Sequence, residues 1–259
     1  MIYDDAPDLY DAHYLAYRDD VPFYTRLAAD AGGPVLELGA GTGRVTEALA
    51  RAGHHVVAVD ASPAMLARAE ERLAAAGVKD DVRLLEADMR ALDLGERFPL
   101  VVAPFNVLMH AYTLDDQDST LSSVVRHLAD GGTFAFDLYA PRFGPRGVVR
   151  VEPGLGASLA AARPGERHDV FLVQEVDEVA QLATTTYFHD ATRGDGTVTR
   201  RVTVLRQRYY TRFEVERLCR AAGLRVSVHG GFDRSRYDER SPLMVCLARR
   251  DPAAASRAR

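Results

Sequence analysis

The feature that most constrains the fold is the stretch VLELGAGTGRV, which occupies residues 35–45. Glycine stands at three alternate positions in it, Gly39, Gly41 and Gly43, between an apolar run and an amphipathic run. Glycine lets the backbone adopt positive φ and lets a ligand touch the main chain. A helix that begins directly after such a turn offers unpaired N–H groups and the positive end of its dipole. The stretch therefore predicts a strand, a turn that receives part of a nucleotide or nucleoside, and a helix.

Composition narrows the class of protein further. The chain has 259 residues, of which 47% are hydrophobic and 27% charged, and this allows one large α/β domain with an insert. A formal charge of −5 disfavours a nucleic-acid partner, because domains that bind polyanions usually carry a basic face. The acidic, aromatic N-terminus does not resemble a signal peptide, and no window holds the roughly 18 uncharged apolar residues of a membrane-spanning helix. Cys219 and Cys246 lie far apart in apolar settings, without a zinc pattern. We expect both thiols to be buried. We also expect a cytoplasmic protein, a monomer or a homodimer, that has no membrane partner.

Residues 31–140 alternate between two hydrophobic periods. The near-continuously apolar runs are typical of strands buried on both faces, and they read PVLEL, HHVVAVD, DVRLLEAD, PLVVAPFNVL and GTFAFDLY. Helical runs lie between them; one opens at Ser62 with Pro63 as its first residue, and another is expected to end at residues 130–132. Alternating strands and helices predict a parallel sheet with right-handed crossovers.

The chain from residue 144 to 208 follows a different pattern. Its Thr/Val/Tyr-rich runs flank Asp195-Gly196, a pair that tolerates the positive φ of a tight turn, so we expect an antiparallel insert lying over the parallel sheet. A capping box at Thr211 and Glu214 then opens another helix. The runs LRVSVHG and SPLMVCLAR follow it and predict an antiparallel strand pair.

Two well-known glycine-rich turns do not fit the opening stretch. The NAD fingerprint G-x-G-x-x-G would need glycine where the chain has Arg44 or Thr46, depending on its start. A P-loop needs a lysine, and this stretch contains none. The pattern present is E-x-G-x-G-x-G, with Glu37 as the acid. It resembles motif I of the class I S-adenosylmethionine-dependent methyltransferases, although an ordinary glycine-rich turn between a strand and a helix would look similar.

The resemblance implies a Rossmann-like α/β fold: a seven-stranded, mostly parallel sheet flanked by helices, here with an inserted antiparallel β layer. It also implies S-adenosylmethionine as the cofactor and S-adenosylhomocysteine as its product. The expected organisation is a lid helix with a cofactor-binding core over residues 1–143, then an inserted sheet covering the substrate over 144–208. The chain returns to the core over 209–250 and ends in a disordered tail over 251–259.

Three further signals lie at the carboxyl ends of consecutive predicted strands. Asp60 ends the second strand, where its carboxylate can accept both ribose hydroxyls or simply cap the next helix. Met65 can pack on the adenine or belong to the core. The resemblance implies that Asp88 accepts the adenine amino group beside Met89; its alternative role is a helix cap. The expected cofactor residues are Tyr14, Arg18, Glu37, Gly39, Ala40, Gly41, Gly43, Asp60, Ala61, Met65, Asp88, Met89, Phe105 and Asn106.

The acceptor would meet the cofactor's methyl group near the end of the fourth strand. His110 follows that strand and is the candidate general base because histidine titrates near neutrality; a structural role is the alternative. Tyr10, Tyr14 and Tyr17 fall at i, i+4 and i+7, on a helix that either closes over the site as a lid or docks on the core. Arg18 is placed to meet the cofactor's carboxylate. The other acceptor-side candidates are Tyr139 and Arg142, with Phe188 and His189 as roof residues in the insert.

These patterns predict transfer of a methyl group from S-adenosylmethionine to a nitrogen or oxygen of a small-molecule acceptor. The N-terminal segment and the insert resemble the lids of small-molecule methyltransferases, such as those acting on sugar amines or glycine. A narrow pocket under the insert disfavours DNA, tRNA and large proteins as acceptors but admits a peptide N-terminus. The alternatives are an NAD(P)-dependent reductase, an aminopropyl transferase, which would need an acid pair where this chain has Asn106, and a non-catalytic module that binds the cofactor.

Overall fold

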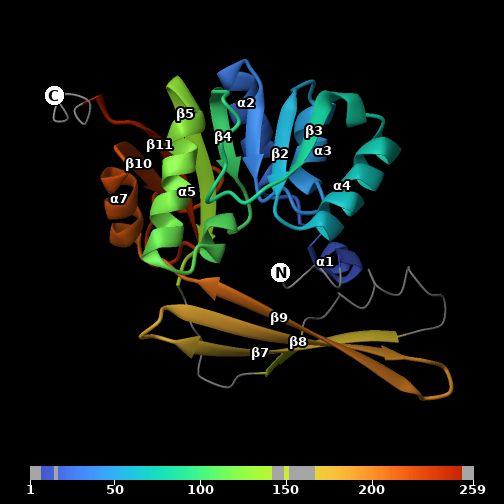
Figure 1. Ribbon diagram of the computed structural model, residues 1–259. Coiled ribbons are helices and arrows are strands. Elements are labelled where there is room, and N and C mark those ends of the chain that lie inside the picture. The colour runs from blue at the N-terminus through green and yellow to red at the C-terminus, as the bar shows by residue number, and fades with distance from the viewer. Residues whose placement is uncertain (1–6, 15–16, 142–148, 152–166, 253–259) are drawn as a thin grey trace. The chain divides into compact units, whose positions relative to one another are not determined.

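The structure is a computed structural model that describes residues 7–14, 17–141, 149–151 and 167–252 (Figure 1). The chain divides into two compact units. One unit comprises residues 1–17 and 142–208, and the other comprises residues 18–141 and 209–259. Each unit has its own sheet. Predicted residue Arg142 and the predicted disordered tail beyond residue 252 lie outside the described residues.

The larger unit is built on a seven-stranded sheet in the order β10-β11-β5-β4-β1-β2-β3. Only β11 runs against its neighbours, and this arrangement confirms the predicted mostly parallel Rossmann-like sheet. The order reverses at β1, and open α/β sheets bind ligands beyond the carboxyl ends of their strands at such a point. The strands are β1 (Val35–Leu38), β2 (Val56–Asp60), β3 (Val82–Glu86), β4 (Phe98–Ala103), β5 (Leu128–Tyr139), β10 (Leu224–His229) and β11 (Leu243–Arg250).

Helices cover both faces of this sheet (Figure 1). Successive strand residues point to opposite faces, so Val101 packs in the cluster under α5 and α7, whereas Leu100 and Val102 pack in the cluster under α2 and α3. This double coverage explains why the strands read as continuous apolar runs. The helices are α2 (Val21–Ala31), α3 (Arg44–Arg51), α4 (Pro63–Ala76), α5 (Leu114–His127) and α7 (Arg212–Ala221), with short 3-10 helices η1 (Lys79–Asp81) and η2 (Val107–His110).

The predicted helix boundaries hold with one correction. The Ser62 hydroxyl accepts a hydrogen bond from the Met65 N–H at 3.3 Å and caps α4, as its sequence predicts. The prediction that the α5 run extends to residues 130–132 is wrong. Leu128 already pairs with Phe98 as the first residue of β5, so the strand pairing ends the helix at His127. Cys219 and Cys246 are buried free thiols, as predicted.

The smaller unit holds α1 (Pro7–Tyr14) and an antiparallel sheet in the order β6-β7-β8-β9. The strands are β6 (Val149–Val151), β7 (Arg167–Asp177), β8 (Leu182–Thr192) and β9 (Val198–Arg208). The turn between β8 and β9 has Gly196 at φ +85°, and the Thr197 N–H donates to Asp195 Oδ1 at 2.8 Å. The predicted hairpin and inserted antiparallel layer are therefore confirmed. Among the helices of the described segments, none combines the length and apolar character that crossing a membrane requires.

Candidate functional site

The glycine turn lies at the carboxyl end of β1, and all three of its glycines have positive φ. A Cβ atom on Gly39 would lie 2.5 Å from Cγ2 of Val107, which sits on η2. A Cβ atom on Gly43 would lie 3.1 Å from the Cβ of Ala69 on α4. Two of the glycines are therefore needed for close packing of the turn against its own neighbours, whereas the sequence analysis had assigned them to positive φ and to contact with a ligand.

Asp60, the last residue of β2, ties this turn in place. Its Oδ2 accepts the Gly41 N–H at 2.8 Å, and its Oδ1 accepts the Ser62 N–H at 2.9 Å. Each carboxylate oxygen has two lone pairs and can accept more than one hydrogen bond. The structure thus brings Asp60 and the glycine turn together. Three other predicted cofactor residues lie near the turn or Asp60 in sequence: Ala40 and Met65 are buried, and Ala61 is exposed.

Glu37 lies beneath the turn, on β1, and is 2% exposed. Its Oε2 accepts the hydroxyl of Thr46 at 2.7 Å. Burial raises the pKa of the Glu37 carboxyl to about 8, against the opposing effects of the Thr46 hydrogen bond and the charge of Arg44. The acid of the E-x-G-x-G-x-G pattern is therefore a buried group that gives up its proton only at the alkaline edge of the physiological range.

A buried ion pair between Arg44 and Asp20 lies beside Glu37, and the sequence analysis did not predict this pair. The guanidinium of Arg44, the first residue of α3, forms two hydrogen bonds of 2.6 Å to the carboxylate of Asp20. The side chains of both residues are almost fully buried. A buried arginine needs such a bidentate partner, since an unpaired charge is very costly away from water. The sequence signal was the arginine itself, which we used only to argue against an NAD fingerprint.

Asp137 on β5 is the third buried carboxylate. Its Oδ1 accepts the hydroxyl of Tyr24 at 2.5 Å and the N–H of Phe105 at 2.9 Å. Burial raises the pKa of Asp137 to about 6, although both hydrogen bonds favour its ionised form. A lone acid in the apolar run GTFAFDLY was the available signal for this residue.

Three buried carboxylates, on Asp20, Glu37 and Asp137, therefore face the single guanidinium of Arg44 among the described residues of this site. Excess negative charge in a buried place is unfavourable unless a cation joins it or a proton neutralises it. Burial is the main cause of the raised pKa values of Glu37 and Asp137, and the charge of Asp20 raises both further. These carboxylates, with Asp60 beside the turn, are hydrogen-bond acceptors and suit a ligand that brings positive charge and hydroxyl groups to the glycine turn.

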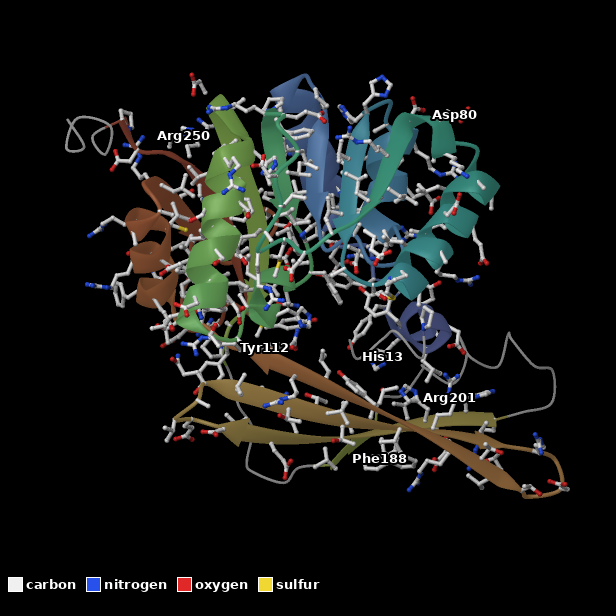
Figure 2. All side chains as sticks on the ribbon, viewed as in Figure 1. His13, Asp80, Tyr112, Phe188, Arg201 and Arg250 are labelled. Atoms are coloured by element: carbon white, nitrogen blue, oxygen red, sulfur yellow. The ribbon has the colours of Figure 1, made fainter. Side chains whose placement is uncertain are left out.

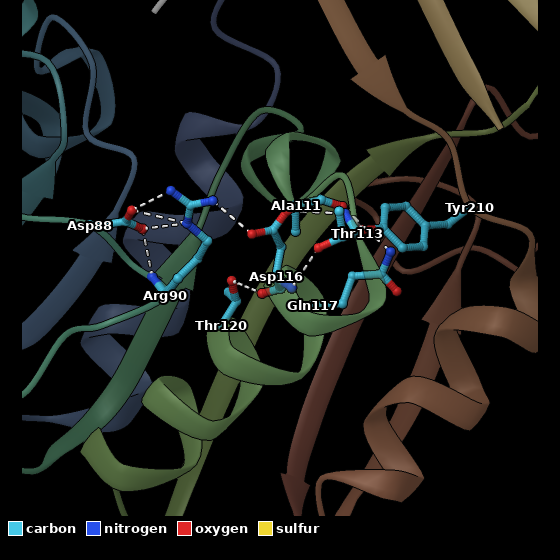
Figure 3. Close-up of polar contacts among 8 residues, drawn as sticks. All are labelled: Asp88, Arg90, Ala111, Thr113, Asp116, Gln117, Thr120 and Tyr210. Atoms are coloured by element: carbon cyan, nitrogen blue, oxygen red, sulfur yellow. Dashed lines mark hydrogen bonds and ion pairs between the residues drawn. The ribbon is translucent and has the colours of Figure 1, made fainter. Parts of the chain in front are cut away.

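Asp88 lies just past β3, and its side chain already has a partner (Figure 3). Arg90 donates from Nε to both carboxylate oxygens, at 3.0 and 2.9 Å, and its guanidinium holds the pKa of Asp88 below its usual range. Arg90 also donates from Nη1 to Asp116 at 2.7 Å, and Asp116 closes a capping box with Thr113 at the start of α5. The adjacent Met89 is half-buried and packs on the core. Sequence reasoning missed Arg90, which links the predicted adenine acid to α5.

The end of β4 joins three of the predicted residues. Phe105 and Asn106 both have positive φ, and Asn106 Oδ1 accepts the Tyr139 N–H at 2.6 Å. His110 closes η2, and its Nδ1 lies 3.3 Å from the hydroxyl of Tyr112. Figure 2 shows Tyr112 beside the first turn of α5. Burial lowers the pKa of His110, so its imidazole is neutral at pH 7 and keeps a lone pair that can accept a proton.

The predicted tyrosine stripe is corrected. Helix α1 ends at Tyr14, so Tyr17 does not share its face; the Tyr17 N–H donates to the carbonyl of Tyr14 at 3.0 Å. Within the smaller unit, the ring centroids of Tyr10 and Tyr14 are 5.1 Å apart, and the Tyr14 and Tyr187 hydroxyls lie 3.0 Å apart. Arg18 is exposed in the larger unit. The aromatic residues of α1 therefore pack on the antiparallel sheet of their own unit.

The two predicted roof residues cannot share one site. Phe188 and His189 are neighbours on β8 and therefore point to opposite faces of the smaller sheet. His189 is buried and its Nε2 lies 3.1 Å from the Thr203 hydroxyl. Phe188 instead lies under the guanidinium of Arg200. Figure 2 shows the same separation between Phe188 and Arg201, the residue that pairs with His189.

Comparison with known proteins agrees with this geometry. Residues 35–132 match a family model described as a methyltransferase domain. The chain is 31% identical over 230 residues to the cypemycin N-terminal methyltransferase of a Streptomyces species, a match covering 85% of this chain and 84% of the relative.

Two solved structures share the fold. The CcbJ methyltransferase from Streptomyces caelestis is 29% identical, with a TM-score of 0.75, and the match covers 90% of each chain. An S-adenosylmethionine-dependent methyltransferase from Clostridium acetobutylicum ATCC 824 has a TM-score of 0.78 at 18% identity, covering 96% of this chain and 98% of the other. At this low identity, the second likeness concerns the fold alone.

Proposed function

Since the chain belongs to the class I S-adenosylmethionine-dependent methyltransferases, we propose that it transfers a methyl group to a nitrogen or an oxygen of a small molecule. The observation that carries the proposal is the surplus of buried carboxylates around the glycine turn, with Asp60 beside it. This environment suits a ligand that is cationic at one end and carries ribose hydroxyls at the other. The 31% identical relative is named an N-terminal methyltransferase, which favours an amine as the acceptor group.

The residues present would hold S-adenosylmethionine as follows. Asp60 would accept the ribose hydroxyls, and Asp88, oriented by Arg90, would accept the adenine amino group. Glu37 and its buried neighbours would stabilise the positive charges of the methionine portion. When bound, the cofactor supplies a methyl group on a sulfonium, which a nucleophile attacks in line. The chain's own contribution is orientation, exclusion of water and control of protons.

We assign to Phe105 and Asn106, predicted as cofactor residues, the wall at which cofactor and acceptor meet, and to Tyr139 the acceptor side; the three lie together at the ends of β4 and β5. An amine acceptor must lose its proton before it can attack, and the neutral imidazole of His110 is the assigned proton acceptor. An amine that arrives unprotonated would need no base. His110→Ala is therefore expected to slow transfer most at pH values above the lowered pKa of His110 and below the pKa of the acceptor amine, where the imidazole is neutral and the amine is still protonated; pH profiles of turnover for both proteins measure this.

A methyl-transfer screen tests this function. Purified protein, labelled S-adenosylmethionine and separate sets of primary amines, short peptides with free N-termini, amino sugars and small phenols would be combined, and S-adenosylhomocysteine would be measured. Release of product with one set supports the proposal and identifies the class of acceptor molecule. Binding of S-adenosylmethionine without turnover on any set would contradict it and indicate a module that only binds the cofactor.

The affinity for S-adenosylmethionine is expected to depend on pH through Glu37. Below its pKa of about 8, Glu37 is protonated in the free protein, and a cationic ligand must displace that proton. The Kd should therefore fall by up to about tenfold per unit as pH rises toward 8, and then level off. Titration calorimetry at pH 6.5, 7.5 and 8.5 measures this. Glu37→Gln keeps a side chain that can accept from Thr46 and should flatten the profile; equal slopes in both proteins contradict the assignment.

Arg90 is expected to affect cofactor binding more than stability. Its ion pairs with Asp88 and Asp116 are partly exposed, so Arg90→Ala should change the free energy of unfolding by less than about 1 kcal/mol. Loss of the oriented Asp88 carboxylate should raise the Kd for S-adenosylmethionine by roughly tenfold. The matched control is Arg97→Ala, an exposed arginine paired with Asp130. Equal Kd values for the two variants would remove Asp88 from the adenine site.

A further inference from the structure

The turn after β4 holds an unusual backbone conformation. Phe105 and Asn106 are consecutive residues with φ of +60° and +67°, a region that residues with a side chain rarely occupy. Asparagine tolerates this region, but a phenylalanine there is strained. Such strain persists only where surrounding contacts impose it, and it collects at functional sites. The contacts that impose it here come from β5 and α2.

Residues of β5 hold both strained positions by hydrogen bonds. Asp137 accepts the Phe105 N–H on its side chain at 2.9 Å and the Asn106 N–H on its carbonyl at 3.2 Å. The Tyr139 N–H donates to Asn106 Oδ1 at 2.6 Å. The Tyr24 hydroxyl, from α2, donates to the same Asp137 oxygen that accepts from Phe105, at 2.5 Å. Each strained residue is thus hydrogen-bonded to β5, and the Asp137 carboxylate is itself held by the Tyr24 hydroxyl.

The Phe105 ring is held as well. The guanidinium carbon of Arg44 lies 5.3 Å from its centroid, and Asp20 fixes that guanidinium through two hydrogen bonds. Tyr24, Asp137 and Asn106 are each 2% exposed or less. Buried hydrogen bonds of this kind specify one arrangement, because breaking any of them leaves a buried polar group without a partner.

We propose that Asp137 is a positioning residue for methyl transfer: with Tyr24, it holds Phe105 and Asn106 in the left-handed conformation that shapes the acceptor side of the site. The proposal depends on the proposed function, in which Phe105 and Asn106 line the acceptor pocket. Asp137 touches neither cofactor nor acceptor in this account. It acts through the backbone N–H of Phe105 and the backbone of its own strand.

The test uses Tyr24→Phe and Asp137→Asn in the full-length protein. Tyr24→Phe removes one hydrogen bond and keeps the buried ring. The control is Thr133→Val, which removes a buried hydroxyl that accepts from Arg249 at 3.0 Å, four residues before Asp137 on the same strand. Thr133→Val should cost stability to a similar extent without changing turnover. If Asp137→Asn fails to fold, Tyr24→Phe alone still decides the question.

Two measurements give the result. Hydrogen–deuterium exchange of the peptide covering residues 104–110 should accelerate at least tenfold in Tyr24→Phe and Asp137→Asn, and not in Thr133→Val. Turnover should fall at least tenfold in the same two variants. In Tyr24→Phe, which keeps the Asp137 carboxylate, the KM for S-adenosylmethionine should change less than threefold. Unchanged exchange would show that Asp137 and Tyr24 do not hold residues 105 and 106 in place. Faster exchange with turnover equal to that of Thr133→Val would show that holding them has no role in methyl transfer. If the wild type methylates no acceptor, the proposed function fails. The exchange measurement still tests whether Asp137 and Tyr24 hold the turn after β4.

Discussion

Asp60→Ala is expected to raise the Kd for S-adenosylmethionine by roughly 100-fold or more, because two hydrogen bonds from ribose hydroxyls to a charged acceptor are lost. The effect has a second source. Asp60 accepts N–H bonds from Gly41 and Ser62, so its removal also releases the glycine turn from the start of α4. Titration calorimetry of the variant against the wild type measures the change.

Asp130→Asn is the matched control for this experiment. Asp130 lies on the same sheet, and its side chain is 94% exposed, so its charge should not matter to the cofactor. Asp60→Asn should fall between the wild type and Asp60→Ala, since the amide oxygen can replace one acceptor but not two. An Asp60→Ala variant that remains folded and binds within threefold of the control would contradict the ribose assignment.

Gly39→Ala is expected to lower the free energy of unfolding by about 3 kcal/mol, the sum of a left-handed backbone penalty and a steric clash. The new Cβ would lie 2.5 Å from Val107, which is buried on η2 against the turn. Denaturant titration of both proteins measures the loss. The clash should also displace η2, which carries His110, and therefore reduce turnover more than stability alone explains.

Gly53→Ala separates the two causes. Gly53 has φ +85°, and a Cβ built there meets nothing within 4 Å, so this variant carries the backbone penalty without the clash. It should lose only about 1 kcal/mol. The double variant Gly39→Ala with Val107→Ala should recover part of the Gly39→Ala loss. Equal losses for Gly39→Ala and Gly53→Ala would show that packing against Val107 does not explain the glycine.

The periodicity of the sequence was sufficient to predict the larger sheet. Strands buried on both faces and helices with one apolar stripe differ in pattern, and this pattern depends on local geometry. The family was recognised from the E-x-G-x-G-x-G turn, a local feature as well, and the comparisons confirm it. The end of α5 was predicted wrongly because Leu128 satisfies the helical stripe while its pairing with Phe98 decides its conformation.

The buried polar residues were harder to foresee. Asp20 and Arg44 are far apart in the sequence, as are Tyr24 and Asp137, and only the packing of α2 and α3 against the sheet brings each pair together. No periodicity marks such partners. Arg90 was missed for a different reason, because an exposed arginine beside an acid is common and its second partner, Asp116, lies on another element. The role of each predicted site residue remains a proposal that these variants test.

The most direct test of the proposed site is a crystal structure of the protein with S-adenosylhomocysteine. We expect the ribose hydroxyls on the Asp60 carboxylate, the adenine edge at Asp88, and the amino-acid portion over the glycine turn above Glu37. The thioether sulfur should face Phe105 and Asn106. S-adenosylhomocysteine bound at any other place, or bound here with the Asp60 carboxylate turned away from the ribose, would contradict it.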